Sequence, residues 1–194
     1  LIEAAAAIGY NPNNLHMACY DWRLPYTALE RRDHYFTRLR SSIELLVRTE
    51  GHKAVVVAHS MGANVWLYFM QWVSATAGPD WVAAHIHAFV PLGGPMLGAV
   101  GPVGALLSGE MQSTAILGPL NRIIDSQMFL LNYTQIRDFL RSWGSLGALL
   151  PMGGDAVWGT ESDPTDCKVH FICRDGHNHT IEGILGELAE EMGT

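Results

Sequence analysis

The segment 54–64 constrains the fold of this chain more than any other, because it indicates a buried strand, a sharp turn and a helix in succession. Residues 54–58 are an uninterrupted apolar run, which is typical of a central strand in a parallel sheet. Ser60 follows, with the small residues Ala58 and Gly62 where strand and helix must cross closely. This pattern predicts a nucleophile elbow, in which a strained turn lifts a serine hydroxyl above the sheet.

The residues on either side of Ser60 largely match the usual motif of a nucleophile elbow. The usual pattern is G-x-S-x-G, and Ala58 takes the place of the first glycine, which adds one methyl group. Residues 65–73 are apolar nearly all round a helix, as expected for the buried helix behind such a serine. The alternative is that Ser60 only caps the helix of an ordinary βα unit.

Helical and strand patterns alternate through the first half of the chain. Helices are expected over 1–8 and 33–50, and strands over 15–20 and 85–90, on either side of the elbow. That order predicts an α/β fold, with a parallel sheet and helices on both faces. After residue 92 the chain stays apolar but becomes rich in glycine and proline, so we separate a core over 1–92 from a different region over 93–194. A cap over a lipid-binding cleft and an ordinary core insertion both fit that second region.

Charge and cysteine content narrow the range of partners. The net charge of −7 leaves no stripe of Lys and Arg for nucleic acid or for an anionic membrane, so any lipid contact would be mainly apolar. The three cysteines give no disulfide framework, and Cys167 and Cys173 either pair or remain free thiols. The longest uncharged stretch, 88–109, carries three prolines and six glycines, so we expect no membrane-spanning helix there.

Several uncommon motifs occur in order along the chain, among them the segment 14–24, which contains Tyr-Asp-Trp-Arg, and the segment 93–98, which begins with Gly-Gly-Pro-Met. Further motifs lie at 58–64, 65–73, 81–82, 85–86, 107–111, 143–145, 150–154 and 157–159. On these residues the chain resembles the lecithin:cholesterol acyltransferase-like family, and within it the phospholipid:diacylglycerol acyltransferases most closely. The resemblance implies an internal fragment of such an enzyme, with part of an α/β-hydrolase core over 1–92 and part of a cap or lid over 93–194.

The resemblance also implies an activity and a place in the cell. Such enzymes are O-acyltransferases that move a fatty acyl group from a phospholipid to diacylglycerol, giving triacylglycerol and a lysophospholipid. They use no cofactor, and a catalytic domain facing the lumen of the endoplasmic reticulum meets the membrane surface through an apolar cap. The alternatives are a phospholipase or lipase that hydrolyses the same acyl-enzyme, a sterol O-acyltransferase, and a lipid-binding protein without catalysis.

The expected chemistry assigns roles to a few residues. Ser60 is the nucleophile, and the backbone N–H of Met61 is one oxyanion donor. The acid and the histidine follow the serine along the chain in this fold, so Asp175 with His177 or His179 is a local candidate pair. The resemblance instead places that stretch in the cap and the catalytic acid and base beyond Thr194. The chain alone is then not expected to turn over substrate.

Two further groups of residues need an interpretation. Asp21, Trp22 and Arg23 follow a predicted strand, at the end where ligands meet open α/β sheets, so they either contact substrate or shape the loop. The pairs His85 with His87 and His177 with His179 each place two imidazoles on one face of a strand. Without a third ligand nearby in sequence, we predict no metal site.

Overall fold

The computed structural model describes residues 2–109, 133–159, 172–174 and 177–193. The chain separates into two compact units, Leu1–Met96 and Leu97–Thr194. Each unit is described by itself below. Cys167 lies outside the described residues, so the pairing of Cys167 with Cys173 stays open.

The first unit holds the predicted strand, turn and helix. Its elements, in chain order, are α1 (Ile2–Ala7), α2 (Tyr26–Asp33), α3 (Tyr35–Glu50), β1 (Ala54–His59), α4 (Met61–Ala77), α5 (Trp81–His85) and β2 (Ile86–Leu92). β1 and β2 pair in parallel and are connected through α4 and α5, which makes a βαβ unit. The elements expected around the elbow are therefore confirmed.

Two details of the first unit differ from the sequence-based expectation. The strand predicted over 15–20 is absent, and that segment makes local backbone bonds instead, such as Cys19 N–H to the carbonyl of Met17 at 3.1 Å. The helix expected from residue 33 begins at Tyr35, because His34 has a left-handed backbone (φ 50°) and ends α2. The carboxylate of Glu30 then caps α3 by accepting the N–H groups of Phe36 and Thr37, at 2.8 and 3.0 Å.

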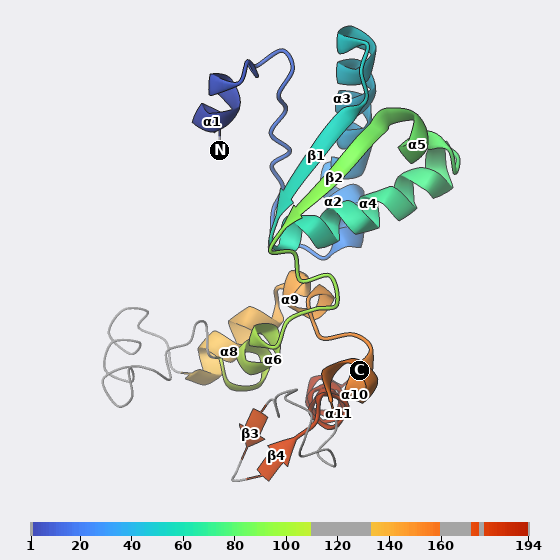
Figure 1. Cartoon of the computed structure of the whole chain (residues 1–194). Coiled ribbons are helices and arrows are strands. Elements are labelled where there is room, and N and C mark those ends of the chain that lie inside the picture. The colour runs from blue at the N-terminus through green and yellow to red at the C-terminus, as the bar shows by residue number, and fades with distance from the viewer. Residues whose placement is uncertain (1, 110–132, 160–171, 175–176, 194) are drawn as a thin grey trace. The chain divides into compact units, whose positions relative to one another are not determined.

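The two-stranded sheet buries one face and exposes the other. Val56 lies opposite Phe89 on the face packed in the core, whereas Val57 lies opposite Val90 on the exposed face. Helices α3, α4 and α5 contact the strands, and the views agree that they lie on one side (Figure 1). Within the described part of this unit, the prediction of helices on both faces is therefore met on one face.

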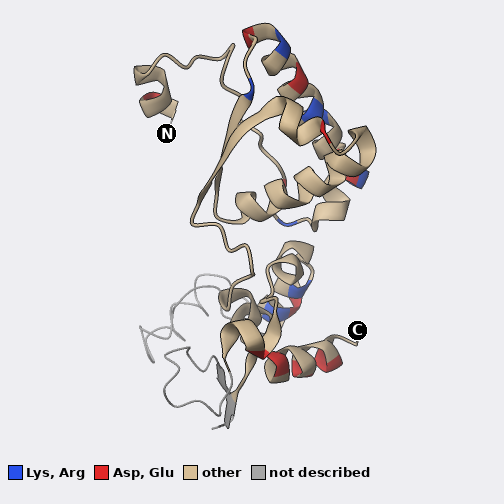
Figure 2. Ribbon diagram, turned by 45° about the vertical axis from the view of Figure 1, so that its right-hand side comes forward, with Lys and Arg blue, Asp and Glu red and all other residues tan. Residues whose placement is uncertain are grey.

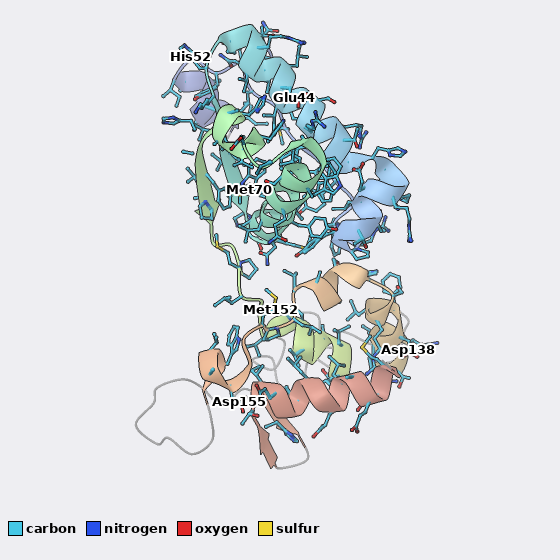
Figure 3. All side chains as sticks on the ribbon, turned by 90° about the vertical axis from the view of Figure 1, so that its right-hand side faces the viewer. Glu44, His52, Met70, Asp138, Met152 and Asp155 are labelled. Atoms are coloured by element: carbon cyan, nitrogen blue, oxygen red, sulfur yellow. The ribbon has the colours of Figure 1, made fainter. Side chains whose placement is uncertain are left out.

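An aromatic cluster forms the core beneath that face. Phe69 is fully buried, and its ring centroid lies 5.0 Å from that of Trp66 and 5.6 Å from that of Trp81. The indole N–H of Trp81 donates to the Glu44 carboxylate at 2.8 Å, and the Arg40 guanidinium donates to the same oxygen at 2.7 Å (Figure 3). These contacts fix α4 and α5 against α3 and so fix the helix that begins at the turn.

The second unit is made of short helices and one hairpin of strands. Its described elements are α6 (Gly101–Ser108), α8 (Tyr133–Arg141), α9 (Gly144–Ala148), α10 (Gly154–Trp158), β3 (Ile172–Arg174), β4 (His177–His179) and α11 (Ile181–Met192). Strands β3 and β4 pair antiparallel. Regular βα alternation is thus missing from the described parts of this unit, in line with its composition.

Polar contacts tie the helices of the second unit together. The Arg141 guanidinium donates to the carbonyl of Leu106 and to the Glu191 carboxylate, both at 2.8 Å, which joins α8 to α6 and α11. The carboxylate of Asp155 accepts the N–H of Glu182 at 3.2 Å at the start of α11 (Figure 3). No helix within the described ranges is long and apolar enough to cross a membrane.

Candidate active site

Ser60 lies at the turn between β1 and α4, as the sequence predicted. Its backbone angles are φ 52° and ψ −129°, and His34 is the other residue besides glycine with a positive φ among the described residues. A side chain with a Cβ held in such a region costs about 1–3 kcal/mol, so the surroundings must impose the conformation. The Ser60 side chain is exposed rather than packed in the core.

Close approach of strand and helix explains the small residues around the turn. A Cβ placed on Gly62 would lie 3.8 Å from the Cβ of Ala58 and 4.0 Å from the hydroxyl oxygen of Tyr20. A methyl group at position 62 would therefore make ordinary van der Waals contacts with the strand and with Tyr20, so the spacing suits a small residue but does not require glycine. Ala58 itself is accommodated, which is why alanine can replace the first glycine of the usual pattern. The predicted crossing of strand and helix is confirmed.

Met61 begins α4, immediately after Ser60. The first N–H groups of a helix have no intrahelical partner, and they lie at the positive end of the helix dipole. Negative charge that develops on a reacting ester oxygen would be stabilised at such a position. The described geometry therefore suits the predicted role of the Met61 N–H, which stays a prediction.

The backbone that follows β2 packs directly on the turn. Ser60 N–H donates to the carbonyl of Leu92 at 2.9 Å. A Cβ on Gly94 would overlap the Cβ of Ala63 and would lie 3.7 Å from the carbonyl oxygen of Ser60. The side-chain amide of Asn64 donates to the carbonyl of Pro95 at 2.8 Å. Our sequence analysis assigned no role to Asn64, although a polar residue directly before the apolar run 65–70 was a visible signal.

Asp21 and Arg23 form an ion pair at the start of the loop that follows Tyr20. The Arg23 guanidinium donates to both carboxylate oxygens of Asp21, at 2.9 and 3.0 Å, and Arg32 of α2 donates to one of them at 3.0 Å. Hydrogen bonds from Arg23 and then from Arg32 hold the pKa of Asp21 well below its usual range. Asp21 therefore stays ionised and links the loop to α2. Arg32 was not predicted, because nothing in the sequence indicates that it approaches Asp21.

The Asp21 side chain is less exposed than those of Trp22 and Arg23. The Asp21 side chain is 16% exposed and that of Arg23 is 56% exposed, while Trp22 is 51% exposed. The loop-shaping interpretation of Asp21 and Arg23 agrees with these contacts. Contact between Trp22 and a substrate stays a prediction.

The local acid and base pair is not brought to Ser60 by any described contact. Asp175 lies outside the described residues, and His177 belongs to β4 of the second unit. The ring of His179 lies 3.0 Å from the Glu187 carboxylate, which occupies one of its nitrogen atoms.

The expectation that His85 and His87 lie on one face of a strand is wrong, because His85 ends α5 and β2 begins at Ile86. His85 stacks on Trp81, with ring centroids 4.4 Å apart, and its Nδ1 lies 2.8 Å from the carbonyl of Trp81. Across the described ranges, no group of three or more His, Cys, Asp or Glu side chains could hold a metal ion. His85 is therefore a packing residue of α5.

The three elements that meet at the turn carry no charged side chains of their own. β1, α4 and β2 contain no Lys, Arg, Asp or Glu, whereas charges in this unit gather on α2 and α3 (Figure 2). On the exposed face of the sheet, Val57 and Val90 lie side by side. An apolar surface of this kind suits an uncharged, hydrophobic reactant better than a charged one.

The parallel βαβ unit, with a serine at its strained strand-to-helix turn, defines a protein of the α/β class. Comparison with known proteins assigns it further. The chain belongs to the lecithin:cholesterol acyltransferase family, whose model matches residues 1–184.

Relatives from two yeasts and a plant are similar over most of the chain. It is 43% identical over 166 residues to a phospholipid:diacylglycerol acyltransferase of Schizosaccharomyces pombe, which covers 84% of this chain and 26% of the relative. Phospholipid:diacylglycerol acyltransferase 1 of Arabidopsis thaliana is 42% identical over 199 residues, covering 98% of this chain and 29% of the relative. The Saccharomyces cerevisiae phospholipid:diacylglycerol acyltransferase is 41% identical over 165 residues, covering 82% and 25%. The chain thus spans between a quarter and a third of the length of these relatives.

Proposed function

We propose that this chain is the nucleophile-bearing part of an O-acyltransferase that transfers a fatty acyl group from a phospholipid to diacylglycerol. The observation that carries the proposal is Ser60, exposed at a strained turn between β1 and α4. The similarity to phospholipid:diacylglycerol acyltransferases, at 41 to 43% identity, supports the choice of donor and acceptor.

The fold that goes with this activity is the α/β-hydrolase fold. The parallel pair β1 and β2 and the elbow helix α4 would be part of its core, and the second unit would belong to a cap or lid. The apolar side chains exposed on the second unit, among them Leu97, Phe139 and Met152, would then face lipid. A place at the endoplasmic reticulum membrane, with the catalytic domain in the lumen, follows from the family resemblance.

The reaction would proceed in two halves around Ser60. The Ser60 hydroxyl attacks the acyl ester carbonyl of the phospholipid, and the Met61 N–H stabilises the oxyanion that forms. The carbon–oxygen bond to the lysophospholipid breaks, leaving an ester between the acyl group and Ser60. A histidine takes the serine proton and returns it to the leaving oxygen. On our sequence-based prediction, this base and its acid partner lie outside residues 1–194.

The second half determines whether the enzyme is a transferase or a hydrolase. The hydroxyl of diacylglycerol gives its proton to the same base and attacks the acyl-enzyme. The ester bond to Ser60 breaks, the base returns the proton to the Ser60 oxygen, and triacylglycerol leaves. Water would give a free fatty acid by the same route, so the outcome depends on keeping water away from the ester. The uncharged surface formed by β1, α4 and β2 supports the exclusion of water.

The proposal is tested in two steps with the full-length protein. A serine-directed fluorophosphonate should label the wild type but not the Ser60→Ala variant. Labelled phosphatidylcholine supplied with diacylglycerol should then yield labelled triacylglycerol. A wild-type protein that fails to label would refute the nucleophile assignment, and free fatty acid as the sole product would refute the transferase assignment.

A further inference from the structure

Asn64 is an unusual side chain for its position. It lies four residues after Ser60 in α4 and is only 6% exposed, and Ser145 is the other buried polar side chain among the described residues. The remaining buried residues of α4 are apolar. Burial of a polar side chain costs free energy unless its hydrogen bonds are made, so its contacts should explain it.

The hydrogen bonds of Asn64 are only half made. Its amide NH2 donates to the carbonyl of Pro95. Because a carbonyl oxygen can only accept a hydrogen bond, the NH2 end of the amide must face Pro95. Its Oδ1 is buried with no partner in the described structure. Leucine has a similar branched shape, so replacing Asn64 by leucine would remove the unpaired oxygen together with the donor to Pro95. What leucine lacks is the bond that holds Pro95.

That bond is the last of three successive contacts between the turn and the segment after β2. Along the turn, Ser60 bonds Leu92, Ala63 touches Gly94, and Asn64 bonds Pro95. The backbone of residues 92–95 therefore lies alongside residues 60–64, next to the serine, and we call this segment the wall. If only the contacts at Leu92 and Gly94 were present, the backbone at Pro95 would be free to move away from the turn.

We infer that Asn64 is a positioning residue for the chemistry at Ser60. By fastening Pro95 to the first turn of α4, Asn64 holds the wall that imposes the strained backbone of Ser60 and keeps its hydroxyl aligned with the Met61 N–H. Asn64 touches no reacting atom and acts through this segment. The inference rests on the proposed role of Ser60 as nucleophile.

The test measures the rate constant of fluorophosphonate labelling in the full-length protein, separately from the fraction of molecules that label. Asn64→Leu keeps the branched shape, with a larger side chain, and removes the donor. The second-order rate constant should fall about tenfold or more, because small displacements of a nucleophile are costly, while the labelled fraction and the unfolding temperature stay close to those of the wild type. A merely structural role would lower the fraction or the temperature and leave the rate constant unchanged.

Other variants serve as control and as replacement. Val73→Ala removes buried volume in the same helix, away from the segment after β2, so it should lower the unfolding temperature and leave the rate constant unchanged. Gly94→Ala places a methyl group against Ala63 and should slow labelling as Asn64→Leu does. If Asn64→Leu does not fold, Asn64→Ala, which also removes the donor to Pro95, is measured in its place and should show the same slowing.

The outcomes separate this inference from the proposed function. Labelling of Asn64→Leu or Gly94→Ala at the wild-type rate would overturn the inference, and so would an equal slowing in Val73→Ala. Absence of labelling in the wild type would instead overturn the proposed function of Ser60.

Discussion

Replacement of Ser60 by glycine should make the protein more stable than replacement by alanine. The Ser60 side chain makes no capping hydrogen bond and is exposed, so loss of its hydroxyl in Ser60→Ala should change stability by less than about 0.5 kcal/mol. Alanine keeps the Cβ in the strained region, whereas glycine removes about 1–3 kcal/mol of strain. Glycine also lowers the free energy of unfolding by about 0.5–1 kcal/mol, because it gives the unfolded chain more conformational freedom. The net gain of Ser60→Gly over Ser60→Ala is therefore about 0–2.5 kcal/mol, centred near 1 kcal/mol.

Urea unfolding followed by tryptophan fluorescence measures this difference, because Trp66 and Trp81 lie in the core beneath the turn. With a slope of about 2 kcal/mol per molar, the midpoint of Ser60→Gly should exceed that of Ser60→Ala by a few tenths of a molar or more. The matched control is Ser41, exposed inside α3, where glycine should be less stable than alanine by about 0.5–1 kcal/mol. Greater stability of Ser60→Ala would show that the serine backbone is not strained.

Three further changes test the packing and electrostatics of the described units. Phe69→Ala should cost about 3–5 kcal/mol in urea unfolding because the ring is fully buried, whereas Leu45→Ala on the exposed side of α3 should cost about 0.5 kcal/mol or less. Asp21→Asn should lower the free energy of unfolding at pH 7, and its difference from the wild type should shrink on acidification. The pKa of Asp21 is lower in the folded state than in the unfolded chain. The carboxylate therefore stabilises the fold fully above about pH 4, and this stabilisation is lost below it. A difference independent of pH would contradict the ion-pair assignment. Thr180→Ala should cost about 1 kcal/mol, since its hydroxyl caps α11 at the N–H of Gly183, while Thr180→Ser should be nearly neutral in the same assay.

The strand, turn and helix around Ser60 could be predicted because local residues determine them. An uninterrupted apolar run needs burial, small residues permit a close crossing, and the apolar helix that follows has to pack on the strand. Each of these requirements is met within about twenty residues of Ser60. The same holds for β2, whose apolar residues supply the parallel partner of β1.

The features that could not be predicted depend on partners far away in the sequence. Residues 15–20 are mostly apolar and fit a short strand, but a strand also needs a neighbour to bond, and the described structure gives this segment local bonds instead. Helix α2 was missed because it is largely polar and ends at a histidine with left-handed backbone. The approach of Arg32 to Asp21 likewise depends on the placement of α2, which no local pattern encodes.

The identity of the serine and its reactivity therefore have different physical origins. Position 60 is marked by the sequence on either side of it, so the site can be located from the chain alone. Its backbone angles are unfavourable for any residue with a Cβ, and the segment that packs and bonds against the turn, residues 92–95, lies about thirty residues further on. Substitutions in the segment 92–95 should consequently alter reactivity at Ser60 as strongly as substitutions next to the serine, even though none of them changes the motif that identifies it.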